Sequence, residues 1–259
     1  AYWGSSENVL FIHGNLASSE WWFPTMEHLQ LLSPMESSPQ GCLITADWRG
    51  YGESKGLKDP TEIDFERYAQ DYIELIESLK LKKVQVVGHS TGGLIAMMAI
   101  LKKPELFKSL VLLDSVGATG LELEFPLEQV LNHFELMSNN KDYCKPVLAA
   151  TIERVDPESP QFQNLFEVTW NCDRVNWRSV PEILSTKIDI SNRMPELKLP
   201  TLILHGELDK VLPLKGSEKL KQQIPQAELK VVEKHGHSYN MEDPHAFSKE
   251  LVRFFGMRS

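Results

Sequence analysis

The segment 86–93, which reads Val-Val-Gly-His-Ser-Thr-Gly-Gly, constrains the fold more than any other part of this 259-residue chain. The β-branched run before it, residues 83–87, predicts a short buried strand, and the apolar run after it, residues 94–101, predicts a buried helix. A chain that passes from strand to helix within one residue forces that residue, Ser90, into a strained conformation, and the flanking glycines prevent a clash. The serine hydroxyl is then expected at the carboxyl edge of a sheet, above the N-terminus of its own helix.

The motif G-x-S-x-G alone occurs by chance in roughly one chain in ten of this length, so its interpretation needs support from the rest of the sequence. That support comes from strand and helix signals, which alternate along most of the chain. Apolar runs predict strands at residues 9–12, 43–46, 83–87, 110–114, 201–204 and 228–232. Helical spacing predicts helices at about 18–31, 65–79, 94–101, 214–223 and 244–255. Continuous apolar strands separated by helices indicate βαβ units, so we expect an α/β fold with a mostly parallel central sheet and helices on both faces.

The alternation is interrupted after residue 116, and no β-alternation appears until about residue 199. Apolar residues at helical spacing indicate helices instead, beginning with Phe125, Leu127, Val130, Leu131 and Phe134. We therefore expect a helical cap, residues 117–195, inserted between two parts of the core, residues 1–116 and 196–259. Some of the cap aromatics could line an apolar substrate pocket, but we expect at least half to form the cap's own core: Phe125, Phe134, Phe162, Phe166, Trp170 and Trp177.

Composition excludes several classes of protein. A formal net charge of −9 without any Lys/Arg cluster argues against nucleic acid or an anionic membrane as the main partner. No apolar run approaches the ~20 residues that a membrane-spanning helix needs. The three cysteines, Cys42, Cys144 and Cys172, suit a reducing compartment, and neither Cys42 nor Cys172 has neighbours at zinc-ligand spacing. We expect a cytoplasmic protein without a bound metal, whose natural N-terminus extends beyond Ala1 because the chain lacks an initial Met.

A serine hydroxyl becomes a nucleophile when a base lies within hydrogen-bond reach and a third group orients that base. In an open parallel sheet these partners come from other strand ends at the same edge. Two predicted strands end in suitable residues, His-Gly-Glu-Leu-Asp at 205–209 and Glu-Lys-His-Gly-His at 233–237. The resulting order of Ser, Asp and His along the chain is the one that accompanies a serine on a strand-to-helix turn.

Five motifs in a fixed order carry a resemblance to a known family. They are His13-Gly14-Asn15, Asp47-x-Arg49-Gly50-x-Gly52-x-Ser54, Gly88-His89-Ser90-Thr91-Gly92, His205-Gly206-x-x-Asp209, and Gly236-His237 followed by Glu242-x-Pro244. On these residues the sequence resembles the α/β-hydrolase fold family over nearly the whole chain outside the insertion. The resemblance implies a lidded serine hydrolase, similar to esterases and lactonases, that needs no cofactor.

The resemblance also implies a role for individual residues. Ser90 would be the nucleophile, His237 the general base, and Asp209 the group that fixes the tautomer of His237. The oxyanion would be held by the backbone N–H groups of Asn15 and Thr91.

Each of these assignments has a rival in the sequence. His235 lies two residues from His237, Glu207 shares a loop with Asp209, and Asp114 ends the preceding core strand. The Gly236 and Glu242-x-Pro244 context favours His237. We expect structural roles for His13, for the Asp47–Arg49 turn and for His89, which packs beside the nucleophile.

The expected reaction is cleavage of a small apolar carboxylic ester or lactone through an acyl-enzyme. A serine at position 90 argues against dehalogenation and epoxide hydrolysis, which use an aspartate there. Three alternatives keep the same three residues: a carbon–carbon bond hydrolase, a cofactor-free haloperoxidase or perhydrolase, and a small-molecule receptor. The sequence makes no prediction of oligomeric state.

Overall fold

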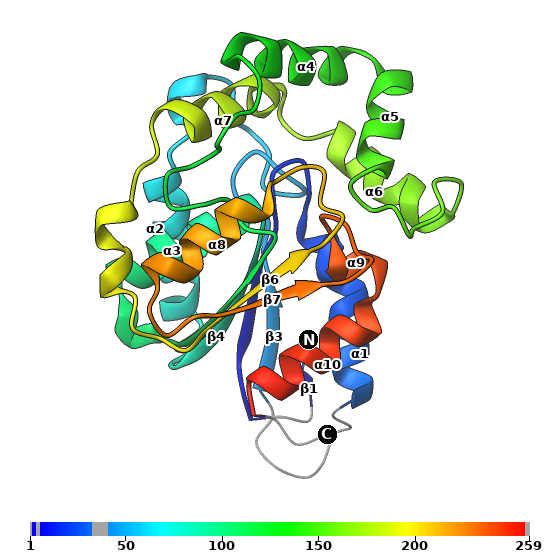
Figure 1. Cartoon of the computed structure of the whole chain (residues 1–259). Coiled ribbons are helices and arrows are strands. Elements are labelled where there is room, and N and C mark those ends of the chain that lie inside the picture. The colour runs from blue at the N-terminus through cyan, green and yellow to red at the C-terminus, as the bar shows by residue number, and fades with distance from the viewer. Residues whose placement is uncertain (1, 4–5, 33–40, 257–259) are drawn as a thin grey trace.

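A computed structural model describes residues 2–3, 6–32 and 41–256 of the chain. Its seven strands form one sheet in the order β1-β3-β2-β4-β5-β6-β7 (Figure 1). β1 pairs antiparallel with β3, and the other neighbours are parallel. The strands are β1 (Tyr2–Trp3), β2 (Val9–Ile12), β3 (Gly41–Thr45), β4 (Val84–His89), β5 (Phe107–Leu113), β6 (Thr201–Gly206) and β7 (Glu228–Val232).

Successive side chains of a strand point to opposite faces of the sheet, and in β2 and β4 the residues on both faces are buried. Helices accordingly cover both faces. On one face, Phe11 of β2 and Val87 of β4 belong to a core cluster with Trp22 and Phe247. This face carries η1 (Ser19–Trp22), α1 (Phe23–Leu32) and α10 (Pro244–Phe254), with the short α9 (Tyr239–Glu242) beside them. The other face carries α2 (Phe65–Ser78), α3 (Thr91–Lys102) and α8 (Leu214–Gln223). The predicted α/β architecture is confirmed.

Strand ends differ from the predicted ones where the backbone leaves the extended region. Lys83 has φ 54° and Asp114 has φ 43°, which no strand residue adopts. β4 therefore begins one residue later than predicted, and β5 ends at Leu113. β4 lies in the middle of the sheet, paired with β2 along 85–88 and with β5 as far as His89. The residue after β4 thus lies at the centre of the sheet's carboxyl edge.

The segment between β5 and β6 is helical, and residues 127–186 of it lie beyond the carboxyl ends of the strands (Figure 1). It contains α4 (Leu127–Asn139), α5 (Lys141–Ala149), α6 (Pro160–Trp170), α7 (Arg174–Thr186) and η4 (Ser191–Glu196). Phe125 does not join the first of these helices as predicted, because Pro126 is the N-cap and the helix begins at Leu127. Phe125 is instead 59% exposed.

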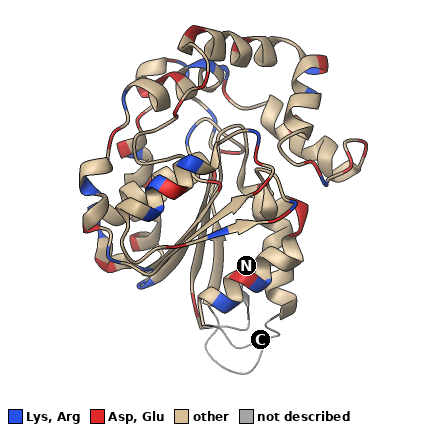
Figure 2. Cartoon of the chain, viewed as in Figure 1, with Lys and Arg blue, Asp and Glu red and all other residues tan. Residues whose placement is uncertain are grey.

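Acidic and basic residues are interspersed over the helices of the sheet region and of the α4–α7 segment (Figure 2). Many of them form exposed ion pairs, such as Arg178 with Glu128. Among the described residues, no helix is both long and apolar enough to cross a bilayer. The three cysteines are free thiols.

Candidate active site

Ser90 occupies a sharp turn between β4 and α3. Its backbone has φ 52° and ψ −121°, a conformation that costs a non-glycine residue free energy. Backbone hydrogen bonds hold it there, since the Ser90 N–H donates to Leu113 O at 2.9 Å and its carbonyl accepts from Val116 at 3.0 Å. Gly92 is required because a Cβ at that position would lie 2.3 Å from Ile12 O. The strained strand-to-helix turn predicted from the sequence is confirmed, and Ser90 is 8% exposed.

His237 and Asp209 meet at the same edge from the loops after β7 and β6. His237 Nδ1 lies 2.8 Å from Asp209 Oδ2. The other carboxylate oxygen, Oδ1, accepts the backbone N–H groups of Val211 at 2.7 Å and Leu212 at 3.0 Å. Burial alone would raise the pKa of Asp209, but His237 and these hydrogen bonds lower it overall. An ionised carboxylate only accepts, so His237 Nδ1 carries the proton and its Nε2 has a free lone pair.

His89 connects the serine turn to the histidine loop. Its Nε2 lies 2.8 Å from the carbonyl oxygen of His237, so that nitrogen carries the proton and donates. The two imidazole rings lie 4.9 Å apart, centroid to centroid. Burial is the main cause that lowers the pKa of His89 to about 3, so the ring is neutral. The packing role expected for His89 thus includes a hydrogen bond to the backbone of His237.

Ser90 Oγ and the His237 imidazole are not hydrogen-bonded to one another in this structure. The hydrogen bonds of the described residues include the one from His237 to Asp209 and none from the Ser90 hydroxyl to the imidazole. Nucleophile–base contacts in ligand-free sites are often longer than those in the substrate complex. The structure therefore brings Asp209 and His237 into direct contact. The third predicted residue, Ser90, directly follows His89 in the sequence.

Asp114, the rival acid, lies deeper in the same cluster. Its Oδ1 accepts the Gly206 N–H at 2.8 Å, and its buried Oδ2 has no hydrogen-bond partner. Burial, and then the charge of Asp209, raises the pKa of Asp114 well above its usual value. A protonated Asp114 that makes no hydrogen bond to His237 is a poor orienting group for that imidazole.

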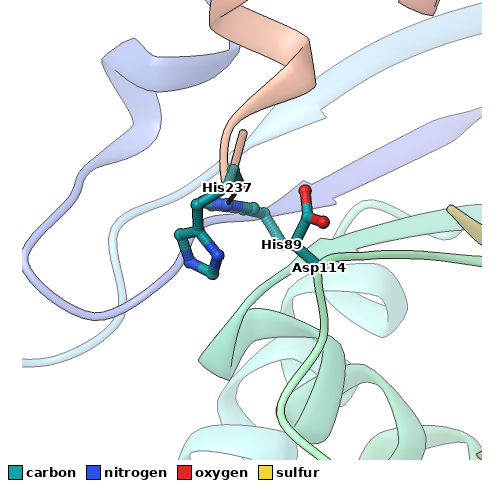
Figure 3. Close-up of side chains that lie close together, drawn as sticks. All are labelled: His89, Asp114 and His237. Carbon is teal, nitrogen blue, oxygen red and sulfur yellow. Dashed lines mark hydrogen bonds between the residues drawn. The ribbon is translucent and has the colours of Figure 1, made fainter. Parts of the chain in front are cut away.

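Figure 3 shows Asp114 with His89 and His237, whose nitrogen and oxygen atoms lie within 4.8 Å of one another. Such spacing is compatible with a metal site, but one nitrogen of each histidine already has a partner. His89 Nε2 donates to a carbonyl, and His237 Nδ1 bonds Asp209. We assign no metal role to the cluster.

The other two rivals also have different partners. His235 Nδ1 donates to the carbonyl of Glu233 at 2.7 Å, and its Nε2 faces Arg154 at 2.8 Å. Glu207 accepts the backbone N–H of Lys234 at 2.9 Å. Neither side chain is hydrogen-bonded to His237, so the geometry favours Asp209 and His237.

The loop after β2 lies against the serine turn, as expected for Asn15. A Cβ on Gly14 would lie 3.0 Å from Ser90 Cβ, a tight contact that would require a small shift of the neighbouring backbone. The Tyr51 hydroxyl donates to Asn15 Oδ1 at 2.5 Å, and the Thr169 hydroxyl donates to Leu16 O at 2.6 Å. Sequence analysis missed both Tyr51 and Thr169, because a hydroxyl that bonds a distant loop leaves no local pattern.

His13 and Asp47 hold neighbouring loops, as predicted. Burial lowers the pKa of His13 to about 4, and its Nε2 lies 3.3 Å from the backbone nitrogen of Trp48. Asp47 accepts the backbone N–H groups of Ser19 at 2.6 Å and Glu53 at 2.9 Å. These contacts join the loops after β2 and β3.

Of the six Phe and Trp residues between β5 and β6, three are buried: Phe162, Phe166 and Trp177. Trp170 and Phe134 are partly buried against the same core cluster. The three buried aromatics belong to a core cluster that also includes sheet residues such as Ile12 and Val86, so the expectation that they form a core of the segment's own stays a prediction.

Comparisons with known proteins agree with this fold. A sequence model described as "Alpha/beta hydrolase family" matches residues 9–250. A putative carbamate hydrolase, RutD, from Agrobacterium fabrum is 25% identical over 95% of this chain and 92% of its own length. A 2-hydroxymuconate semialdehyde hydrolase from Pseudomonas putida is 28% identical over 84% of this chain and 78% of its own. The solved esterase EaEST from Exiguobacterium antarcticum has the same fold, with a TM-score of 0.84 at 23% identity over 99% of this chain and 94% of that one.

Proposed function

The chain belongs to the alpha/beta hydrolase family, and on that basis we propose that it cleaves a carboxylic ester or lactone through an acyl-enzyme on Ser90. The observation that carries this proposal is the 2.8 Å contact between His237 Nδ1 and Asp209 Oδ2, at the sheet edge that also holds the strained Ser90 turn. The contact leaves His237 Nε2 free to accept a proton.

In the first half of the reaction, Ser90 Oγ attacks the carbonyl carbon of the ester as its proton moves to His237 Nε2. Asp209 holds the imidazole in the required tautomer and stabilises the imidazolium. The carbonyl oxygen becomes an oxyanion, which we assign to the backbone N–H groups of Asn15 and Thr91. One donor of this kind typically contributes about 10²–10³ in rate.

In the second half, the carbon–oxygen bond to the leaving alcohol breaks and His237 returns its proton to that alcohol. Water then attacks the acyl-enzyme, with His237 as the base that takes one water proton. The carboxylic acid leaves, and the proton returns to Ser90 Oγ. Each step needs only the groups on these loops and water.

We propose that residues 117–195 act as the cap of this site. Support comes from contacts of α4–α7 and their connections with loops at the sheet edge, including Thr169 with Leu16 and Arg154 with His235. An apolar cap core and a nearly covered Ser90 suit a small apolar acyl or alkoxy group.

Other chemistries of the family use the same three residues. The relatives described as a carbamate hydrolase and a semialdehyde hydrolase widen the range to carbamates and to carbon–carbon bonds. A haloperoxidase or perhydrolase would add peroxide as the attacking group, and a receptor would turn over its ligand once or very slowly. Measuring whether the purified protein hydrolyses several esters with repeated turnover distinguishes an ester hydrolase from a receptor.

The decisive experiment is labelling with a fluorophosphonate, followed by mass spectrometry to locate the adduct. We expect the adduct on Ser90, its loss in Ser90→Ala, and labelling slowed by at least about 10²-fold in His237→Ala. Ser115→Ala is the matched control, because its hydroxyl only donates to Val116 O at 2.9 Å. Unaltered labelling in Ser90→Ala would refute the mechanism. p-Nitrophenyl esters of increasing chain length, together with lactones, would then define the substrate.

A further inference from the structure

Tyr51, in the loop after β3, contacts the loop after β2 through its hydroxyl. The side chain is fully buried, and the hydroxyl donates to Asn15 Oδ1 at 2.5 Å. The same oxygen also accepts the backbone N–H of Leu16. One buried hydroxyl therefore contacts two consecutive residues, and the first of them, Asn15, is the proposed oxyanion donor that lies outside the serine turn.

Burial determines the direction of these two hydrogen bonds. It raises the pKa of Tyr51 well above its usual value, so the phenol keeps its proton. That proton is donated to Asn15 Oδ1, and a lone pair of the same oxygen receives the Leu16 N–H. Among the described residues, the Asn15 side chain makes no other hydrogen bond. Tyr51 is therefore the group that holds the Asn15 side chain, and it holds it by the amide oxygen.

The backbone beside Asn15 needs such support. Leu16 has φ 54°, a conformation that a non-glycine residue keeps only when its surroundings hold it. The Asn15 N–H donates to no acceptor in the part of the chain that the structure describes, so it is available to a substrate oxygen. Gly14 precedes this N–H and lies close to Ser90, since a Cβ there would be 3.0 Å from Ser90 Cβ. The serine turn on one side and Tyr51 on the other thus limit the direction of the N–H.

Tyr51 is itself held from two sides. Its ring packs on Trp48, with the centroids 4.2 Å apart. The preceding residue, Gly50, accepts two hydrogen bonds through its carbonyl oxygen, from the side-chain amide of Asn176 at 2.9 Å and from the backbone N–H of Asp173 at 2.8 Å. Both donors belong to the start of α7, so the loop that carries Tyr51 is fixed by the sheet region and by the helical segment together.

We propose that Tyr51 is a positioning residue for ester cleavage, whose hydroxyl sets the backbone N–H of Asn15 at the angle that receives the oxyanion. The inference rests on the proposed function for the identity of the nucleophile and of the oxyanion donors. The oxyanion exists only after Ser90 has attacked the ester. Loss of the Tyr51 hydroxyl should therefore weaken stabilisation of the transition state and leave binding of the intact ester unchanged.

The test begins with Tyr51→Phe, which removes only the hydroxyl oxygen. We expect kcat for p-nitrophenyl butyrate to fall about tenfold, less than the 10²–10³ that follows complete removal of one oxyanion donor. KM should change by less than about twofold, because both halves of the reaction use the same oxyanion site.

A boronic acid supplies a second readout that a general loss of structure would not produce. Ser90 Oγ adds to the boron atom of butylboronic acid as its proton moves to His237, and one oxygen of the tetrahedral adduct takes the place of the oxyanion. The dissociation constant of this inhibitor should rise in Tyr51→Phe by the same factor by which kcat falls. Titration with a fluorophosphonate should find the same fraction of active sites as in the wild type.

Two neighbouring tyrosines provide matched controls. The ring of Tyr68 packs on the same Trp48 at 5.2 Å, centroid to centroid, and its buried hydroxyl has no hydrogen-bond partner. The Tyr72 hydroxyl donates to Ala46 O at 2.7 Å, so Tyr72→Phe loses a hydrogen bond that does not involve the loop after β2. Tyr68→Phe and Tyr72→Phe should both keep the wild-type kcat and the wild-type affinity for the boronic acid.

Asn15→Ala removes the other partner of the hydrogen bond and keeps the backbone N–H. It should show the same fall in kcat, with the same KM and the same weaker binding of the boronic acid. It also carries the test if Tyr51→Phe does not fold. Because both substitutions remove one shared contact, the double variant should be no slower than the slower single variant. Losses that multiply to about 100-fold in the double variant would overturn the inference.

The results separate this inference from the proposed function. If Tyr51→Phe has the kcat of Tyr68→Phe, or loses kcat without weaker binding of the boronic acid, the positioning role is wrong. Labelling of Ser90 in the wild type would still support the proposed function in that case. A wild type that is not labelled at Ser90 and hydrolyses no ester overturns both.

Discussion

Replacing Asp209 by asparagine tests the proposed acid with a change of one atom. In the wild type, Asp209 Oδ1 accepts two backbone N–H groups, from Val211 and Leu212, and Oδ2 faces His237 Nδ1. In Asp209→Asn, the amide oxygen of the new side chain must stay with the two backbone donors, since an NH₂ group there would oppose both of them. The amide nitrogen is then placed against His237 Nδ1.

The consequence is the wrong tautomer of the base. A donor facing Nδ1 moves the imidazole proton to Nε2, which can then no longer accept the proton of Ser90. We expect kcat for ester hydrolysis to fall about 10³–10⁴-fold, the loss typical of this change in a serine triad, which corresponds to about 4–5.5 kcal/mol of activation free energy. The free energy of unfolding should change by less than about 2 kcal/mol, because both backbone hydrogen bonds are retained.

The assay is steady-state hydrolysis of p-nitrophenyl butyrate, with thermal unfolding to show that the variant is folded. Asp114→Asn is the matched control, because the Asp114 side chain, like that of Asp209, is fully buried at a neighbouring strand end but makes no hydrogen bond to His237. It should retain kcat within about tenfold. A folded Asp209→Asn enzyme with wild-type kcat would refute the tautomer argument. A large loss only in Asp114→Asn would move the acid role to that residue.

Three further predictions concern stability. The pKa of Asp114 is raised in the folded state, so its contribution to the free energy of unfolding is present below about pH 4 and is lost as pH rises. The melting temperature of Asp114→Asn, relative to that of the wild type, should therefore rise between pH 4.5 and pH 8. The pKa of His89 is lowered to about 3, so the unfolded chain binds the extra proton below about pH 6.5. Urea unfolding should show the wild type losing about 2 kcal/mol more than His89→Gln between pH 7 and pH 5, and equal losses would contradict this. Gly92→Ala should cost about 3 kcal/mol in the same assay, because its Cβ would lie 2.3 Å from Ile12 O, whereas Gly216→Ala in α8 has nothing within 4 Å and should stabilise by about 0.5–1 kcal/mol.

The parts of the fold that could be predicted are those with local causes. β2 and β7 match their predicted bounds: the apolar run of β2 lies between the polar Asn8 and His13, and β7 ends at Val232, before the polar Glu233 and Lys234. The two-residue β1 escaped prediction because pairing with β3, rather than its own pattern, makes it a strand. α9 was not predicted either, because its four residues are too few to show helical periodicity.

In the candidate site, too, features with local causes could be predicted, and contacts between distant segments could not. Ser90 was predictable because its strained turn requires glycines at fixed neighbouring positions, and Asp209 and His237 because parallel strands end at one edge. Tyr51 and Thr169 were not, because the loop atoms they bond lie 36 and 153 residues away in sequence. The contact of Arg154 with His235 spans 81 residues and depends on the path of the cap.

The proposed cap also contacts the loop that carries the proposed oxyanion donor Asn15. Thr169 bonds the carbonyl of Leu16, a residue with φ 54° that directly follows Asn15. A non-glycine residue keeps such a conformation only when its surroundings hold it, so a cap hydroxyl helps to fix the backbone of the proposed oxyanion donor. If that is so, Thr169→Val should lower kcat, whereas Thr169→Ser, which keeps the hydroxyl, should not. The part of the chain without a recognisable motif would then help to set the geometry of the proposed oxyanion hole.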